Sequence, residues 1–398
     1  MLIRSLRQTD IPLIIRLWND CVQAGEVLYY PLTAAYFTRK FMENEGCEPE
    51  NLLAAEADGQ VIGLIHGVAP ETFRGGKPGN AYLTVLLVDR AWRGRGVGRA
   101  LLGALEEKMR ARGAETLFIS SVNPVNLDWR IPGTPGHDHN NMPGLDAECA
   151  GAGFFARSGF ECRYREVAMY IDLAAFRMNP RIPDMRQKLQ AEGIYTGPYD
   201  ATWNCAFDRM CDGVGSDYWR DVLRTEIAAH RAHAPNADSR FWADGVRPQG
   251  PRLLLTAVRD GQIVGFTGPV DRQRSGRGWF TGICTDPAYG RRGIATVLFS
   301  LLMAEFQREG AAFSTLFTGA DNPARKIYEQ AGMRAVRRFE LMAKTLEMEI
   351  RRGEDGRERS LSMPEREPER AVFAFVDLIM PTIFRVCGRR NGLVRRAC

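Results

Sequence analysis

Short apolar runs alternate with stretches of helical periodicity along most of the chain. Residues 279–285 are β-branched and aromatic, which is typical of a buried strand. From residue 295 to residue 308 the apolar positions follow a helical spacing, and Gly310 marks the end of that helix. Residues 81–88 and 98–112 show the same strand-then-helix order nearer the N-terminus. This alternation predicts a mixed, α+β-like α/β fold.

The same order of elements occurs twice. The segment 89–96 reappears as 286–293, and the hairpin 58–63 reappears as 260–265. Both repeats are separated by about 200 residues and keep their order along the chain. An Asn-Pro pair follows the second strand of each repeat. The chain is therefore predicted to hold two copies of one domain.

The repeat sets the expected domain limits. An N-terminal domain carries a Pro- and Gly-rich insertion at about 127–152, which is too long for a plain connector and is expected to form a lid or binding loop. The composition of residues 351–370, nearly all Arg, Glu, Gly, Ser and Pro, is that of a linker. The predicted parts are 1–175 for the first domain, 176–198 for a linker, 199–346 for the second domain, and 347–398 for a charged linker and basic tail.

A basic glycine loop precedes a helix in each copy. A helix N-terminus offers unpaired N–H groups and a positive dipole end, and glycine lets the backbone approach a ligand closely. In the second copy Arg291 and Arg292 stand beside Gly293 and add fixed positive charge suited to phosphate oxygens. The alternative is a tight turn with solvated charges. We favour a diphosphate site.

The loops resemble those of a known family. Arg93, Gly96 and Gly98 fit the pattern (Arg/Gln)-x-x-Gly-x-(Gly/Ala) of the acyl-CoA loop in the GNAT (Gcn5-related N-acetyltransferase) superfamily. The second copy keeps the second half of this pattern but has Gly290 where Arg or Gln is usual. Residues 322–333 resemble the family's closing segment. The chain thus resembles bacterial proteins with two tandem GNAT domains, each a twisted mixed sheet flanked by helices.

The resemblance implies an acetyl-CoA-dependent N-acetyltransferase. In that family the donor and an amine meet in one complex, a backbone N–H holds the oxyanion, and a tyrosine protonates the leaving thiolate. Tyr328 has the matching place in the second copy and is the predicted general acid. Phe155 has that place in the first copy and carries no proton to donate, so the second copy is the one expected to be catalytic. The alternative for Tyr328 is a half-buried core aromatic.

The resemblance also implies which residues bind the donor. Backbone at the strand ends would pair with the pantetheine arm like an added strand, the loops would bind the diphosphate, and an asparagine would approach the arm or only cap the next helix. These residues are Ile283, Thr285, Arg291, Arg292, Gly293, Ile294, Ala295, Thr296 and Asn322 in the second copy, and Leu86, Val88, Arg93, Gly94, Arg95, Gly96, Val97, Gly98, Arg99 and Asn123 in the first.

Other polar residues of the insertion are weaker candidates. His137, Asp138 and His139 form a short polar cluster, but no third ligand at a metal-site spacing accompanies them, so no metal is predicted. A role as base toward the acceptor amine stays open. Asp146 and Glu148 either bind a cationic acceptor or keep the loop soluble.

Charge and composition limit the remaining function classes. The net charge is +5, and residues 351–398 hold 11 arginines against 7 acids. The rest of the chain is nearly neutral, which argues against a general nucleic-acid binder and leaves only the Arg-rich end for DNA. No run of 18 apolar residues predicts a membrane span, and nine cysteines without a C-x-x-C pair indicate reduced thiols in the cytoplasm.

Two function classes remain. The first is the acetyltransferase, whose partners are acetyl-CoA and an amine that the sequence leaves open, as it leaves open the acyl chain length and the oligomeric state. The second is a non-catalytic acyl-CoA-binding regulatory or scaffold protein with degenerate GNAT domains.

Overall fold

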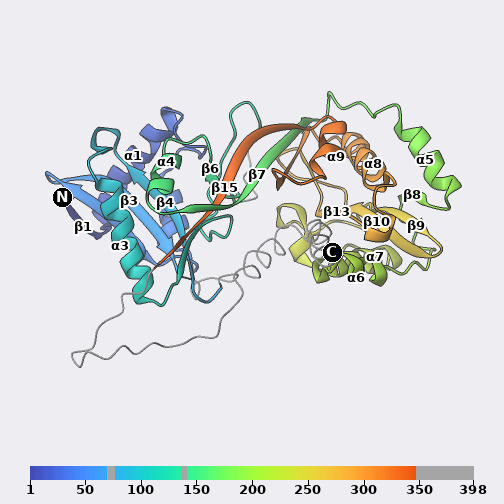
Figure 1. The fold of residues 1–398 in the computed structure, drawn as a ribbon, viewed down its shortest axis with the longest axis horizontal. Coiled ribbons are helices and arrows are strands. Elements are labelled where there is room, and N and C mark those ends of the chain that lie inside the picture. The colour runs from blue at the N-terminus through green and yellow to red at the C-terminus, as the bar shows by residue number, and fades with distance from the viewer. Residues whose placement is uncertain (70–76, 136–140, 347–398) are drawn as a thin grey trace, which may run out of the picture. The chain divides into compact units, whose positions relative to one another are not determined.

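The computed structural model describes residues 1–69, 77–135 and 141–346 (Figure 1). His137, Asp138 and His139, and the predicted tail 347–398, lie outside the described residues. The chain forms two compact units, which we call the first and the second unit. Among the described residues, the first contains Met1–Glu166 and 337–346, and the second contains Val167–Val336. Each unit combines strands and helices, which confirms the predicted mixed α/β class.

The first unit is a mixed sheet with helices packed on it. The strands run in the order β1-β2-β3-β4-β5-β15, in which β4 and β5 are parallel and the pairs from β1 to β4 are antiparallel. Its strands are β1 (Leu2–Ser5), β2 (Leu52–Ala57), β3 (Gln60–Val68), β4 (Asn80–Val88), β5 (Thr116–Ile119) and the short β6 (Leu145–Asp146). Its helices are α1 (Ile11–Gln23), α2 (Ala34–Phe37), α3 (Val97–Ala111) and α4 (Ala152–Arg157). The strand β7 (Glu161–Asp172) leads from this unit into the second.

Helix α3 provides much of the core of the first unit. Leu101, Leu105 and Met109 recur at helical spacing and are each fully buried against the sheet. A Cβ at Gly67 of β3 would lie 2.8 Å from the Leu105 side chain, so the helix and the sheet approach closely only because this position is glycine. Burying each leucine side chain stabilises the folded state by about 1.5–3 kcal/mol.

The last described strand completes the sheet of the first unit. Strand β15 (Arg334–Thr345) runs antiparallel to β5, and Met342 lies opposite Ile119. Met342 and Leu346 are buried in the core of the first unit. The sequence pattern assigned this strand to the second domain, at 199–346. Alternating side chains show that a segment is a strand, but they do not say which sheet it joins.

The same strand holds a turn of the first unit in place. Opposite β15, Leu145 and Asp146 of β6 form a short antiparallel ladder. A Cβ at Gly144 would lie 2.4 Å from the Glu340 carbonyl oxygen, so only glycine fits this approach. The Arg337 guanidinium donates from Nε and Nη2 to the two Asp146 carboxylate oxygens, both at 2.8 Å, and from Nη1 to Glu148 at 2.7 Å. Residues nearly 200 positions apart therefore fix this turn.

The second unit repeats the plan. One sheet has the order β13-β10-β9-β8, and β12 pairs in parallel with β14 and antiparallel with β11. Its strands are β8 (Tyr195–Pro198), β9 (Leu255–Arg259), β10 (Gln262–Gly268), β11 (Asp271–Arg272), β12 (Arg277–Trp279), β13 (Gly282–Thr285) and β14 (Phe313–Gly319). Its helices are α5 (Ile182–Ala191), α6 (Asp208–Val214), α7 (Asp217–Arg231), α8 (Ile294–Arg308) and α9 (Arg325–Gln330).

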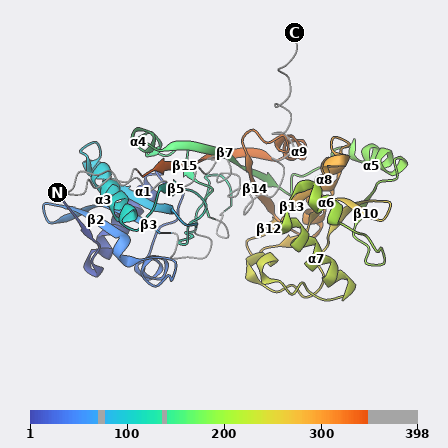
Figure 2. The same ribbon diagram turned by 60° about the horizontal axis from the view of Figure 1, so that its bottom comes forward.

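Helices cover both faces of that sheet. Ala257 and Val264 are buried in one cluster with α8, whereas Val258 and Ile263 are buried in another cluster with α6 and α7. Successive strand residues point to opposite faces, so both faces are apolar and both are covered. Figures 1 and 2 show α8 on one side of the sheet and α7 on the other. Within the predicted linker 176–198, the chain forms α5, which packs against α8.

Over the described part of the chain, the structure has no helix that is both long and apolar enough to cross a bilayer.

A buried histidine braces strand β4. The pairing of β3 with β4 shifts register at His66, which leaves Thr84 as an extra residue, or bulge, in β4. The His66 Nδ1 and Thr84 Oγ1 atoms lie 2.6 Å apart, and the same hydroxyl donates to the His66 carbonyl at 3.1 Å. His66 is fully buried and its Nε2 has no hydrogen-bond partner. Burial lowers the pKa of His66 to about 3.

This burial predicts loss of stability in mild acid. Above pH 6.5 His66 is neutral in both the folded and the unfolded state, so it contributes no pH dependence. Between pH 6.5 and pH 3 the unfolded state binds a proton and the folded state does not, which favours unfolding. From pH 7 to pH 4.5, His66 should lower the free energy of unfolding by about 2–3 kcal/mol. Urea unfolding of wild type and His66→Gln at these two pH values measures the difference. If the free energy of unfolding of His66→Gln fell as much as that of the wild type, buried His66 would not be the cause of the acid sensitivity.

The Arg337–Asp146 pair predicts a second stability effect. Asp146 is buried, so Arg337→Gln leaves a buried carboxylate without its partner and should cost on the order of 3 kcal/mol. Arg338→Gln is the matched control, because Arg338 is the exposed neighbour on the same strand. It should change stability by less than about 0.5 kcal/mol. Equal unfolding midpoints for the two variants in guanidinium would show that β15 does not hold the turn through this pair.

Candidate functional site

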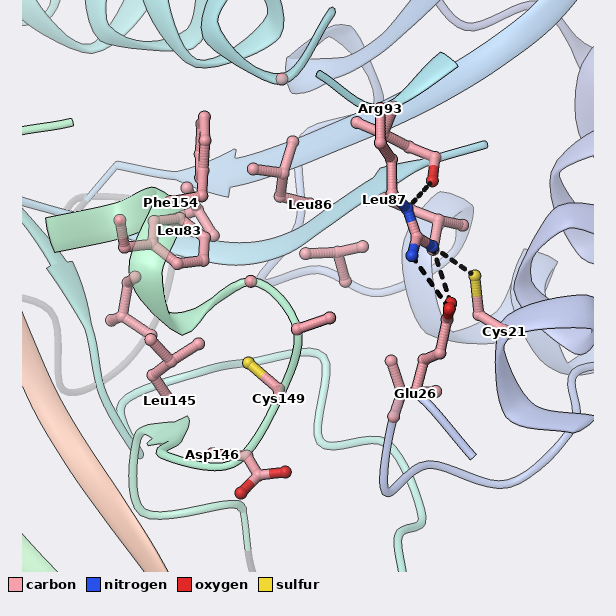
Figure 3. Close-up of a pocket in the computed structure, with 18 of the residues that line it drawn as sticks. Cys21, Glu26, Leu83, Leu86, Leu87, Arg93, Leu145, Asp146, Cys149 and Phe154 are labelled. Atoms are coloured by element: carbon pink, nitrogen blue, oxygen red, sulfur yellow. Dashed lines mark hydrogen bonds and ion pairs between the residues drawn. The ribbon is translucent and has the colours of Figure 1, made fainter. Parts of the chain in front are cut away.

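The first unit contains a cavity of about 660 Å³ (Figure 3). It lies along Leu83–Val88 of β4 and is bounded by the glycine loop 93–99, by the turn 142–151, and by helix α4. Its volume is in the range of small-molecule sites. The cavity therefore lies where the first copy's predicted donor site was placed.

Strand pairing opens this part of the sheet. β4 and β5 pair in parallel only from Asn80 to Tyr82, opposite Thr116 to Phe118. Beyond Tyr82, β4 remains paired with β3 on its other side. The two parallel strands thus separate at the bulge, and the edge of β4 along Leu83–Val88 faces the cavity instead of β5. An unpaired strand edge can bind an extended amide-containing ligand.

Several predicted donor-binding residues of the first copy line the cavity: Leu86, Val88, Arg93, Gly94, Gly96, Gly98 and Arg99. Three others lie elsewhere. Arg95 stacks over the Trp92 ring at 5.3 Å, Val97 is buried in the core, and Asn123 lines a smaller adjoining cavity of about 40 Å³.

The glycine loop has the conformation that an anion site needs. The Asp89 carboxylate accepts a hydrogen bond from the Ala91 backbone N–H at 2.8 Å and fixes the start of the loop. Gly94 and Gly96 have φ of 74° and 85°, in the left-handed region that favours glycine. Gly96 is the N-cap of the 15-residue helix α3, whose first-turn N–H groups are free of helical partners.

Arg93 is held by the protein itself. Its Nη1 and Nη2 donate to the two carboxylate oxygens of Glu26 at 2.9 and 2.7 Å, and its Nε donates to the Val88 carbonyl at 3.0 Å. These contacts with Arg93 are the main reason that the pKa of Glu26 falls to about 2. The Arg93 charge is therefore compensated. Arg99 and Arg157 are exposed at the cavity, and in the described part of the chain no carboxylate pairs with them.

The insertion forms one wall of the cavity. Met142, Leu145, Asp146 and Cys149 all belong to the predicted insertion 127–152 and line the cavity. In Figure 3 the Cys149 sulfur and the Leu145 side chain lie opposite the Glu26–Arg93 pair. No sequence pattern pointed to Cys149, because a single cysteine has no spacing to match.

The cavity also contains groups that can donate a proton. Tyr29 follows α1 and lines the cavity, and burial raises its pKa to about 12. Burial likewise raises the pKa of the Cys149 thiol. Both groups are protonated at neutral pH. Phe155 stands where a tyrosine is usual, with its ring centroid 5.3 Å from Phe154, and it also lines the cavity. Tyr29 and Cys149 are functional candidates that the sequence analysis missed.

The glycine loop of the second copy has a matching conformation. Arg291 has φ of 63° and Gly293 has φ of 86°, the values found at Gly94 and Gly96 to within about ten degrees. The surroundings differ. A Cβ at Gly293 would lie 2.5 Å from the Met185 Cε atom of α5, whereas a Cβ at Gly96 would meet nothing within 4 Å. Arg292 pairs with Glu192, which follows the same helix, at 2.5 Å.

The remaining predicted residues of the second copy divide between core and surface. Tyr328 on α9 is 5% exposed, its ring centroid is 4.8 Å from that of Phe299, and burial raises its pKa. The Asn322 side chain accepts from the Ala324 N–H at 2.9 Å, which is the capping role named as its alternative. Ile283 and Ile294 are buried in the core, while Thr285, Ala295 and Thr296 are half-buried.

Within residues 1–69, 77–135 and 141–346, the structure brings together no group of three or more His, Cys, Asp or Glu side chains suited to a metal ion.

Comparison with known proteins identifies the repeated domain. The profile of the acetyltransferase (GNAT) family matches residues 15–128 and 217–333, which together make up more than half of the chain. Acetyltransferase ECA0875 of Pectobacterium atrosepticum is 32% identical over 119 residues, which are 30% of this chain and 74% of that protein. Acetyltransferase plu1384 of Photorhabdus laumondii is 32% identical over 131 residues, which are 33% of this chain and 80% of that protein.

A solved structure shows the same fold across both units. The GCN5-related glucosamine N-acetyltransferase region of a fungal multi-domain GH3 beta-N-acetylglucosaminidase superposes with a TM-score of 0.51 at 16% identity. The match covers 86% of this chain and 38% of that one. At this identity the likeness concerns the fold alone. Because the family profile matches both copies and the two relatives agree with it, the chain belongs to the GNAT family of acetyltransferases and carries two tandem GNAT domains.

Proposed function

We propose that the protein is an acetyl-CoA-dependent N-acetyltransferase and that the cavity of the first unit is its donor site. One observation carries the proposal: a single cavity is bounded by the open edge of β4, by the glycine loop at the start of α3, and by α4. Family membership supplies the reaction class, transfer of an acyl group from an acyl-CoA to an amine. The seven described cysteines are free thiols, which fits a reaction in the cytoplasm.

Each part of the cavity has a defined task in this reaction. The loop at Gly94, Gly96 and Gly98 and the Arg99 guanidinium would bind the diphosphate, and the β4 edge from Leu83 to Val88 would bind the pantetheine amides. Holding donor and amine together removes much of the entropic barrier. The amine nitrogen forms the new bond to the acyl carbon, the carbon–sulfur bond breaks, and the thiolate takes a proton.

That proton needs a donor in the first unit, because Phe155 has none. Tyr29 and Cys149 line the cavity and keep their protons at neutral pH. Either group would replace the tyrosine of the family, whose position in the first unit is that of Phe155 on α4.

The second copy is the second candidate. Its glycine loop keeps the donor-site conformation, and it alone retains a tyrosine, Tyr328, at the family's position. Against it stand the burial of that tyrosine beside Phe299 and the contact of Met185 with Gly293. A protein that binds acyl-CoA without transferring the acyl group is the remaining alternative.

A carboxylate introduced at equivalent positions separates the two copies. Arg99→Glu places a carboxylate at the proposed diphosphate site and should weaken acetyl-CoA binding by about tenfold or more. Thr296→Glu places a carboxylate at the matching position of the second copy and should leave that affinity unchanged. Calorimetry of both variants and the wild type measures the effect. Loss of binding only in Thr296→Glu would move the donor site to the second copy, and no binding by the wild type would end the proposal.

Turnover then locates the proton donor. With acetyl-CoA and a mixed amine panel, thiol release by Tyr328→Phe should match the wild type. Tyr29→Phe or Cys149→Ser should lower kcat by about 100-fold, since a positioned general acid contributes that much or more. Abolished turnover in Tyr328→Phe alone would instead assign catalysis to the second copy. Acetyl-CoA binding without thiol release for any amine would favour the non-catalytic alternative.

A further inference from the structure

We infer that the first unit's cavity accepts an amine on an apolar body, such as an aryl-alkyl monoamine, and discriminates against polyamines and amino sugars. This inference rests on the proposed function and names the substrate class of the same site. The sequence left this choice open, because Asp146 and Glu148 were candidates for binding a cationic acceptor.

The acidic groups that line the cavity are already bound by arginines. Among the described residues that line it, the carboxylates are those of Glu26 and Asp146. Glu26 pairs with Arg93 through both oxygens and also accepts from Arg90 at 2.6 Å. Asp146 pairs through both oxygens with Arg337. In Figure 3 the Asp146 carboxylate points away from the apolar side chains of the cavity. Neither acid is left to receive an ammonium group.

The wall that remains is apolar. The cavity is lined by the apolar side chains of Leu83, Leu86, Met142, Leu145 and Phe154. An acceptor that buries a ring or a branched alkyl group against these side chains gains about 0.8 kcal/mol for each CH₂ removed from water. A hydroxyl-rich sugar would lose hydrogen bonds to water that this wall does not replace.

The arginines at the cavity also disfavour polyamine acceptors. Arg99 and Arg157 lie at the cavity, are exposed, and have no carboxylate partner in the described chain. They suit the phosphates of the donor and repel a second ammonium group on the acceptor. A polyamine would therefore bring an extra charge into a site that has no acid to pair with it.

The first test is a comparison of acceptors on the full chain. Initial rates with acetyl-CoA and 2-phenylethylamine, spermidine or glucosamine give kcat/KM for each amine. We expect 2-phenylethylamine to exceed the other two by about 100-fold, as an apolar pocket can discriminate between ligands on this scale. Comparable values for spermidine or glucosamine would overturn the inference. Calorimetry of the three amines with the protein–CoA complex should give the same ranking of affinities without turnover. Absence of turnover would therefore count against the proposed function, whereas a different ranking of affinities would count against this inference.

An isosteric pair of variants isolates the role of charge. Leu145 is half-buried at the cavity wall, and Leu145→Asp adds an unpaired carboxylate where Leu145→Asn adds only polarity. The ratio of kcat/KM for 2-phenylethylamine to kcat/KM for spermidine should fall in both variants. The fall should be about tenfold larger in the aspartate variant than in the asparagine variant. Equal ratios would show that missing negative charge does not set the preference. Thermal unfolding and acetyl-CoA binding check that both variants fold, and Met142→Asp with Met142→Asn is a second pair on the same wall.

Discussion

The separation of β4 from β5 is the constraint on which the site of the first unit depends. Two parallel strands that stayed paired along their length would satisfy each other's backbone groups and close the sheet. Here pairing stops at Tyr82, next to the bulge at Thr84 that His66 braces from the core. The edge of β4 then borders a cavity, and the glycine loop at the end of the same strand supplies helix N–H groups to that cavity. This one interruption of the sheet thus provides a groove along β4 for an extended ligand. At the end of that groove, the glycine loop and the helix N–H groups suit the ligand's phosphates.

Charge compensation decides what else the cavity can do. Arg93 fits the family's loop pattern, yet its guanidinium is bound by Glu26, which lies 67 residues earlier in the chain. Asp146 is similarly bound by Arg337. The two acids that line the cavity are therefore bound by arginines, whereas Arg99 and Arg157 have no carboxylate partner in the described chain. These exposed cations beside an apolar wall are the physical basis of both the donor site and the acceptor class that we propose.

The two copies are related in sequence but not independent in structure. Strand β15 belongs to the second repeat, yet it pairs with β5, contributes Met342 and Leu346 to the core of the first unit, and holds the turn that walls the cavity. In the second copy, α5 places Met185 against Gly293, where the first copy leaves the equivalent glycine open. Equivalent loops with similar φ angles therefore have different surroundings, and these surroundings are the reason we place the donor site in the first unit.

The sequence by itself determined the elements and the repeat. Apolar periodicity gave α8 as Ala295–Arg308, where the structure has Ile294–Arg308, and the loop motifs gave the GNAT family, because both depend on local spacing. Several features were decided only by tertiary structure: the Arg93–Glu26 pair, the placement of β15 in the first unit, the helix in the predicted linker, and the roles open to Tyr29 and Cys149. Each of these depends on contacts between residues far apart in the chain, and neither hydrophobic pattern nor motif spacing encodes which distant partner a side chain or a strand edge will meet.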